Sequence, residues 1–131
     1  MIIRRFDLEK DYKTLTDLST KWSLPSTPKT WIPEDTFVVE QDNIIICSGS
    51  LYQLGKSAMF WIEGLITDKD ADKNIRKEGL NILINKLFQL GKEQGAEIVM
   101  TSTPRESLKD IFLANGFNPT PEKYYHVGRF D

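Results

Sequence analysis

The stretch AMFWIEGLITDKDADKNIRKEGLNILINKLFQLGKEQGAEIVM, residues 58–100, decides the fold class of this chain. It begins with a strand-like run, Ala58–Ile66, and ends with a second one, Ala96–Met100. Between them, Ile75–Glu93 repeats apolar side chains at helical spacing, and Gly95 follows as a helix stop. A strand, a helix and a strand in this order predict a parallel crossover, and therefore an α/β fold with a mixed sheet.

The segment before this unit predicts an antiparallel meander. Thr36–Glu40 and Ile44–Leu54 are strand-like, and a short polar turn follows each of them. With Ala58–Ile66 they make three consecutive strands. A further strand, Ile2–Phe6, is expected at the start of the chain.

A helix and a long connection separate the first strand from the meander. From about Asp11 to Trp22 the apolar residues recur at helical spacing, and either Asp11 or Asp7 can cap the helix. Ser23–Asp35 contains three prolines, so it cannot be one helix or a central strand. We expect an irregular loop that holds Trp31, and long loops of this kind are often functional.

The C-terminal part predicts one more helix and one more strand. Thr103-Pro104-Arg105-Glu106 combines a threonine cap, proline at the first helical position and glutamate at the third. The helix is expected to stop at Asn115-Gly116, and Tyr124–Phe130 is the expected last strand.

Length and charge limit the classes of function. We expect one domain, 1–131, because 131 residues suit a single core. A net charge of −2 gives no bulk-charge reason to expect nucleic-acid binding. No apolar run approaches the ~18 residues that cross a bilayer, and the N-terminus lacks the apolar core of a signal peptide.

Cysteine and histidine counts argue against a metal centre. Cys47 and His126 are the single residues of their kinds, which excludes an internal disulfide and an intrachain Cys/His zinc site and fits a reducing cytoplasm. The run Asp68-x-Asp70-x-Asp72 resembles a calcium loop. It lacks the glycine and the bidentate glutamate which that loop requires, so we expect no metal.

The order of elements and three short phrases resemble the GNAT-type N-acetyltransferases over nearly the whole chain. The phrases are Trp61-Ile62-Glu63-Gly64-Leu65-Ile66, Thr101-Ser102-Thr103 followed by Ser107-Leu108, and Asn115-Gly116-Phe117. The chain is more similar to the compact GNAT-like proteins of tailed-phage genomes, which act in the host cytoplasm, than to the larger bacterial enzymes. The resemblance implies a mostly antiparallel mixed sheet, helices on both faces, and splayed fourth and fifth strands.

The resemblance also implies a coenzyme segment. The family signature R/Q-x-x-G-x-G/A has its counterpart in Arg76-Lys77-Glu78-Gly79-Leu80-Asn81, where Asn81 replaces the final Gly or Ala. Amides at a helix start bind phosphate, and glycine permits close approach. The residues expected to hold acetyl-CoA, the co-substrate, are therefore Leu65, Ile66, Arg76, Lys77, Gly79, Leu80 and Asn81. The alternative is that Gly79 is a packing residue.

The resemblance implies that Glu63 is the catalytic base, because many members of the family carry a glutamate on this strand. An ammonium group must lose a proton before it attacks a thioester, so a base has to be positioned beside it. Strand alternation places Glu63 on one face with Trp61 and Leu65. The alternative is a carboxylate at the sheet edge or one paired with a cation.

The expected acid and substrate residues come from other segments. Members of the family carry a tyrosine four residues before the Gly116 position to protonate the leaving thiolate, and this chain has Phe112 there. The substitute from the last strand is Tyr124, Tyr125 or His126, although such residues more often pack in a sheet. Trp31 is the expected residue on the substrate side.

The resemblance thus implies transfer of an acetyl group to a primary amine of a small molecule or a peptide, with a homodimer as a possible state. The alternative is a catalytically inactive GNAT-like module that binds coenzyme or protein. Asn81 and Phe112 favour that alternative, whereas Glu63 and the element order favour the enzyme.

Overall fold

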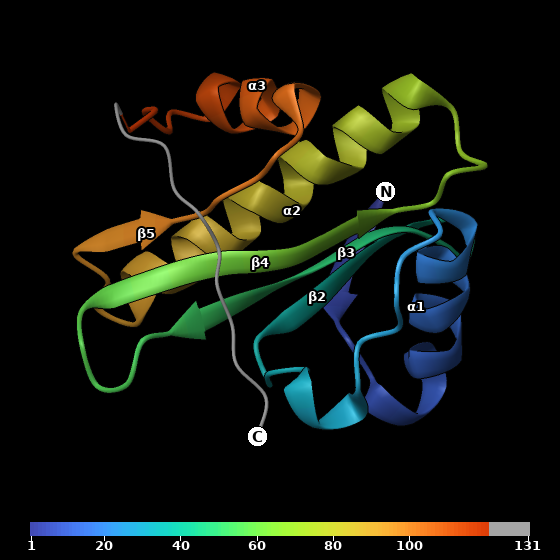
Figure 1. Ribbon diagram of the computed structural model, residues 1–131, viewed down its shortest axis with the longest axis horizontal. Helices are drawn as coiled ribbons and strands as arrows, with labels where there is room; N and C mark the ends of the chain where they lie inside the picture. The colour runs from blue at the N-terminus through green and yellow to red at the C-terminus, as the bar shows by residue number, and fades with distance from the viewer. Residues whose placement is uncertain (121–131) are drawn as a thin grey trace.

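One five-stranded sheet organises the chain in the computed structural model, which describes residues 1–120 (Figure 1). Its strands, in spatial as well as chain order, are β1 (Ile2–Arg5), β2 (Thr36–Gln41), β3 (Ile44–Gln53), β4 (Met59–Thr67) and β5 (Ile98–Met100). The helices are α1 (Leu8–Lys21), the 3₁₀ turn η1 (Lys29–Trp31), α2 (Lys73–Glu93) and α3 (Glu106–Ala114). The first four strands pair antiparallel and β5 pairs parallel with β4, which confirms the expected mixed sheet.

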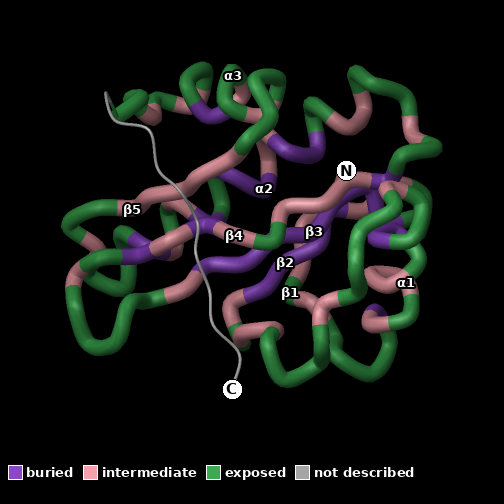
Figure 2. Tube along the Cα trace, in the orientation of Figure 1, coloured by how far each residue is buried: buried purple, intermediate pink, exposed green. Residues whose placement is uncertain are grey.

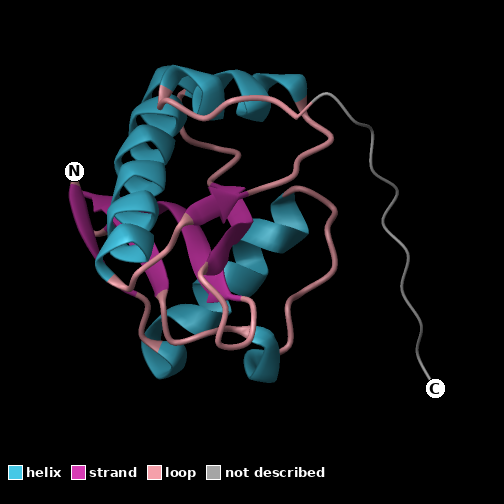
Figure 3. Ribbon diagram, turned by 90° about the vertical axis from the view of Figure 1, so that its left-hand side faces the viewer, coloured by secondary structure: helices cyan, strands magenta, loops and turns pink. Residues whose placement is uncertain are grey.

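Helices cover both faces of this sheet, as expected. Phe37 and Val39 pack with α2, whereas Val38 between them packs with Leu18 of α1, because successive strand residues point to opposite faces. Figure 3 shows the two helices on either side of the strands. The buried residues concentrate along β2 and β3 (Figure 2), so the centre of the sheet carries both cores. No helix within residues 1–120 is long and apolar enough to cross a membrane.

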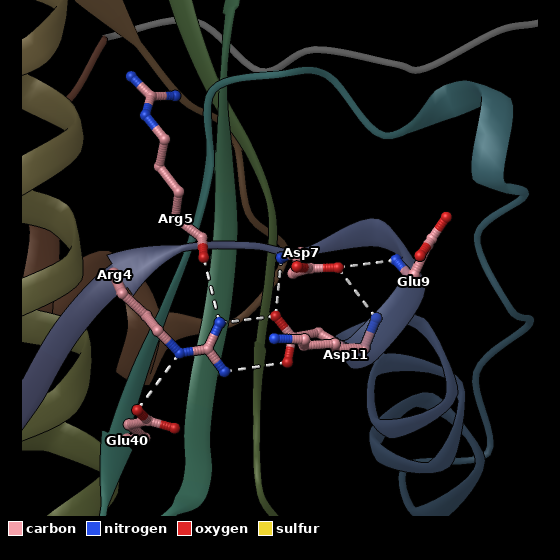
Figure 4. A network of polar contacts seen from close by, with 7 residues as sticks. Arg4, Arg5, Asp7, Glu9, Asp11 and Glu40 are labelled. Carbon is pink, nitrogen blue, oxygen red and sulfur yellow. Dashed lines mark hydrogen bonds and ion pairs between the residues drawn. The ribbon is translucent and has the colours of Figure 1, made fainter.

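An acidic pair at the start of α1 fixes this helix to the sheet. Asp7 caps the helix by accepting the amide N–H groups of Glu9 and Lys10, both at 3.0 Å, so α1 begins before the expected Asp11. Asp11, 5% exposed, accepts two hydrogen bonds from the Arg4 guanidinium at 2.7 and 2.9 Å (Figure 4). This contact lowers the pKa of Asp11. The ion pair therefore joins α1 to β1.

A β-bulge in β4 changes which side chains share a face. Ser48 pairs with Ile66 and Ser50 with Glu63, so three steps along β4 oppose two along β3. Gly64 takes the extra position with a left-handed φ of +70°. The expected alternation is therefore wrong beyond Glu63. Leu65 turns to the α2 side and joins the core there, and its neighbour Ile66 joins the α1 side.

The expected splay of the two strands before and after α2 is confirmed. β5 accompanies β4 only from Met59 to Trp61, while β4 continues to Thr67. The hydroxyl of Thr101 donates to the Ile62 carbonyl at 2.9 Å just beyond the last paired residues. Within residues 1–120, the β5-facing edge of β4 beyond this point has no strand partner.

The start of α3 differs from the expectation. The helix begins at Glu106 with Arg105 as its N-cap residue, and no side chain caps it. The Thr103 hydroxyl accepts the N–H of Arg105 at 3.1 Å, which forms a turn ahead of the helix instead of a cap. The expected stop at Asn115-Gly116 is confirmed. The expected strand Tyr124–Phe130 lies outside the described residues.

Candidate functional site

A cavity of about 310 Å³ lies on the α1 face of the sheet, beside the bulge of β4. Its floor is formed by polar side chains of the central strands, and its walls by apolar side chains of α1 and the proline-rich loop. The floor includes Thr36, Ser48, Ser50, Tyr52 and Glu63, the walls include Leu15, Leu24, Trp31 and Ile32, and Ile66 of β4 adds a further apolar side chain. The cavity is thus apolar around a small set of polar groups, as small-molecule sites usually are.

Glu63 and Trp31, two of the predicted site residues, line this one cavity. The half-buried Glu63 accepts the indole N–H of Trp61 through Oε1 at 2.5 Å. Trp31 is 59% exposed, and its carbonyl accepts the Tyr52 hydroxyl at 3.1 Å. Burial raises the pKa of Tyr52, so its hydroxyl stays protonated at neutral pH.

Three hydroxyl groups on the floor differ in their hydrogen bonding. Thr36 donates to the Pro33 carbonyl at 2.8 Å and lies 2.7 Å from the hydroxyl of Ser50, which is therefore the donor of that pair. Ser48, 1% exposed, has no hydrogen-bond partner for its hydroxyl among the described residues. Sequence reasoning missed this residue. The signal was present, because Ser48, Ser50 and Tyr52 alternate along one strand.

The predicted coenzyme segment does not begin its helix. Asp72 caps α2 by accepting the N–H of Asn74 at 2.8 Å, so the helix starts at Lys73. Amides beyond the first turn are hydrogen-bonded within a helix, so the expectation of a helix start at Arg76–Asn81 is wrong. Gly79 faces β3, where a Cβ atom would lie 3.2 Å from both Cys47 Sγ and Ile46 Cγ2. This close contact supports the alternative that Gly79 is a packing residue.

The other signature residues in this segment have separate surroundings. Leu80 is buried in the core. Asn81 Oδ1 accepts a hydrogen bond of 2.8 Å from Asn115 beyond the end of α3. This side chain therefore fastens α2 to α3. Lys77 is exposed on α2.

The loop between β4 and α2 is held by internal contacts. The Arg76 guanidinium donates to the carbonyls of Lys69 and Ala71 at 2.9 and 3.1 Å. Lys21 of α1 bridges Asp68 and Asp70 at 3.0 and 2.9 Å, and this lysine lowers the pKa of Asp70. The acidic run is therefore used in ion pairing, and residues 1–120 contain no group of three side chains suited to a metal ion.

Three cations surround one aromatic ring at the open end of β4. The indole N–H of Trp22 donates to the Thr67 carbonyl at 2.7 Å. Charged groups of Arg105, Lys69 and Arg76 lie 5.0, 5.4 and 5.8 Å from the centre of the Trp22 ring. We call these four residues the Trp22 cation cluster. The helical spacing up to Trp22 gave no sign of this cluster, because spacing within α1 says nothing about segments that follow later in the chain.

Phe112 occupies the position at which the resemblance places the acid that protonates the leaving thiolate. Phe112 is buried, and its ring meets Phe117 edge-on with centroids 5.0 Å apart, so it is a packing residue. Tyr124 lies outside the described residues.

Comparison with known proteins gives matches among solved structures. No family model and no curated protein matches the chain. A crystal structure of a probable acetyltransferase matches with a TM-score of 0.76 and 15% identity, covering 100% of this chain and 99% of that one. Rv2747 from Mycobacterium tuberculosis, in complex with CoA and NLQ, matches with a TM-score of 0.70 and 16% identity, covering 94% of this chain and 76% of that one. The aminoglycoside N-acetyltransferase AAC(6')-Iy, in complex with CoA, matches with a TM-score of 0.66 and 17% identity, covering 98% of this chain and 100% of that one. The fold is that of the GNAT acetyltransferases.

Proposed function

Given a GNAT acetyltransferase fold, we propose that this protein transfers the acetyl group of acetyl-CoA to a primary amine of a small molecule or a peptide. One observation carries the proposal. The half-buried carboxylate of Glu63 lines a cavity beside the point where β4 and β5 part. Solved neighbours that contain CoA support the choice of coenzyme.

The splayed strands and the Trp22 cation cluster suit two parts of acetyl-CoA. The pantetheine arm carries amides that need backbone partners, and the β5-facing edge of β4 at Leu65 and Ile66 has no strand partner within residues 1–120. Its phosphates need cations, which Arg105 and Lys69 supply. Arg76 holds the loop in place.

The remaining signature residues have a supporting role in the proposal. Gly79 and Leu80 seat α2 on the sheet, and Asn81 joins α2 to α3. Their contribution is to fix the first turn of α2, whose amides favour an anion. Lys77 adds positive charge on the exposed side of the helix.

In the proposed reaction, Glu63 accepts a proton from the acceptor ammonium. The free amine then attacks the thioester carbonyl, and a backbone N–H near Leu65 stabilises the developing oxyanion. The attacking nitrogen gives up its second proton to solvent, the C–S bond breaks, and CoA leaves as a thiolate, which takes up a proton. Tyr124 remains the proposed source of that proton. Trp31 borders the acceptor at the exposed mouth of the cavity.

Further parts of the proposal concern setting and assembly. The reducing cytoplasm, that of a host cell if the protein is phage-encoded, suits a chain whose one cysteine is buried. A homodimer is proposed as well, and sedimentation of the purified protein tests it directly.

A Glu63→Gln variant tests the function. We expect kcat to fall about 10²- to 10⁴-fold, because proton transfer loses its base, while the Kd for acetyl-CoA holds. Released CoA is measured with a thiol reagent at neutral pH. Burial raises the pKa of Cys47 to about 12, so this thiol does not react.

Glu93→Gln, at the exposed end of α2, is the matched control and is expected to keep the wild-type rate. An unchanged kcat in Glu63→Gln would show that Glu63 is not the catalytic base. A wild-type protein that releases CoA with no amine would contradict the function itself.

A further inference from the structure

The cavity beside Glu63 has a size, a charge and a hydrogen-bonding pattern that select among acceptors. Resting on the proposed function, we infer that the acceptor is a compact primary monoamine with an apolar body and one hydrogen-bonding group at its far end. Each part of this description comes from a different observation.

The volume of the cavity limits the size of the acceptor. At about 310 Å³ it lies at the lower end of the range for small-molecule sites. A compact acceptor fits such a space, whereas an aminoglycoside of several rings would extend beyond its exposed mouth at Trp31.

The charge of the lining limits the number of amines. Glu63 is the single charged side chain among the described residues that line the cavity. One ammonium can pair with its carboxylate. A second ammonium in the cavity would have no second carboxylate to pair with, and burial of an unpaired charge is strongly unfavourable.

Ser48 defines the far end of the acceptor. Its hydroxyl is buried and without a partner among the described residues, whereas Thr36 and Ser50 on the same floor bond to each other. Ser50 lies opposite Glu63, and Ser48 precedes Ser50 by two residues on β3. Two residues span about 7 Å along a strand. An acceptor whose amine meets Glu63 can therefore reach Ser48 with a hydroxyl or amide group. The apolar walls between the two ends suit an apolar body.

The test compares two amines that differ by one hydroxyl group. Tyramine carries a hydroxyl at the end of its ring opposite the aminoethyl chain, and phenethylamine lacks it. We expect the wild-type protein to bind tyramine about 3- to 10-fold more tightly in calorimetry, because one hydrogen bond to a buried group is gained. The Ser48→Ala variant is expected to bind tyramine and phenethylamine with equal affinity. Removing an unpartnered buried hydroxyl leaves no new unsatisfied group, so this variant is expected to fold, which thermal unfolding checks.

Ser57→Ala, in the turn before β4 and outside the cavity lining, is the matched serine control and is expected to keep the tyramine preference. Sisomicin, an aminoglycoside, serves as the polycationic probe and is expected to be a poor acceptor. Preferential acetylation of sisomicin, a tyramine ratio unchanged by Ser48→Ala, or no binding of either monoamine would overturn the inference.

Failure of the inference can be told apart from failure of the proposed function. Amine binding is measured without acetyl-CoA, and transfer is measured with it. A tyramine preference that depends on Ser48 but comes without CoA release would support the acceptor class and contradict the enzyme. CoA release with sisomicin alone would support the enzyme and contradict the acceptor class.

Discussion

Gly79 is a signature residue that packs closely against the sheet. It lies where α2 approaches β3, and a Cβ atom would come within 3.2 Å of a sulfur atom and a methyl carbon. Such contacts are tighter than ordinary van der Waals packing, so the Cys47 and Ile46 side chains would have to move by a few tenths of an ångström to admit a Cβ atom. A glycine allows the helix to pack closely on the sheet.

We predict that Gly79→Ala lowers the free energy of unfolding by about 1–3 kcal/mol, the usual effect of overpacking. The gain in helix propensity, about 1 kcal/mol, offsets only part of this loss. Urea unfolding measures the change, and Glu78→Ala on the exposed side of the helix is the control. An unchanged stability with a tenfold loss of acetyl-CoA affinity would instead place Gly79 at the coenzyme.

Two residues illustrate what single-residue reasoning can and cannot find. Glu63 was identified because the resemblance implies a glutamate on this strand and because the chemistry requires a base. Ser48 was missed because a serine in a strand is unremarkable by itself. Its significance depends on burial and on the absence of a partner within the described residues, and both are tertiary properties.

Helix α1 depends on a charged contact with the first strand. Arg4 binds both oxygens of Asp11 and also donates to Glu40 of β2 at 3.3 Å, so one guanidinium connects three elements (Figure 4). Asp11 also accepts the backbone N–H of Asp7 at 2.7 Å, which links the pair to the helix cap. The placement of α1, and with it one wall of the cavity, follows from these contacts.

We predict that Asp11→Asn lowers the free energy of unfolding by about 1.5–3 kcal/mol at pH 7, the value of hydrogen bonds to charged groups. The pKa of Asp11 is lowered in the folded protein. Its contribution is therefore fully present above the unfolded pKa of about 3.9 and is lost as the pH falls through the lower folded value.

Urea unfolding from pH 7 to pH 2 should accordingly show a steeper loss of stability in the wild type than in Asp11→Asn. Asp17→Asn, on the exposed face of the same helix, is the control. Parallel pH curves for the wild type and Asp11→Asn would show that the ion pair does not stabilise the fold.

Two expectations at the scale of elements were wrong, one about where a helix starts and one about which side chains of a strand share a face. The Thr-Pro-x-Glu pattern favours a helix start at Pro104, yet the Thr103 hydroxyl bonds to the residue that precedes the helix. Strand alternation fails beyond Glu63 because a bulge shifts the register by one residue. Gly64 hints at a bulge, but only the pairing with β3 fixes its position.

The molecule as a whole should respond to its proposed co-substrate. Acetyl-CoA would connect the splayed edge of β4 with the Trp22 cation cluster, and these belong to segments far apart in the chain. A ligand that binds only the folded state stabilises it by mass action.

We predict that acetyl-CoA at a hundredfold excess over its Kd stabilises the fold by about 2.7 kcal/mol, which raises Tm by several degrees for a domain of this size. Differential scanning fluorimetry measures the shift. Salt should reduce it, because phosphates meet exposed cations. Arg105→Ala should reduce it too, and ATP, which lacks the pantetheine arm, should give a smaller shift. An equal shift with ATP, or none with acetyl-CoA, would contradict the proposed coenzyme site.

The order of strands and helices, the proline-rich loop and the candidates Glu63 and Trp31 were determined by the sequence itself. These features depend on periodicity and residue chemistry over short segments, which are local properties of a chain. The tertiary structure alone decided that Gly79 packs on β3, that Asn81 joins α3, and that Trp22 gathers three cations. It also decided which floor hydroxyl of the cavity lacks a partner among the described residues. Each of these depends on which distant segments meet, and that is fixed by packing and strand register rather than by local spacing.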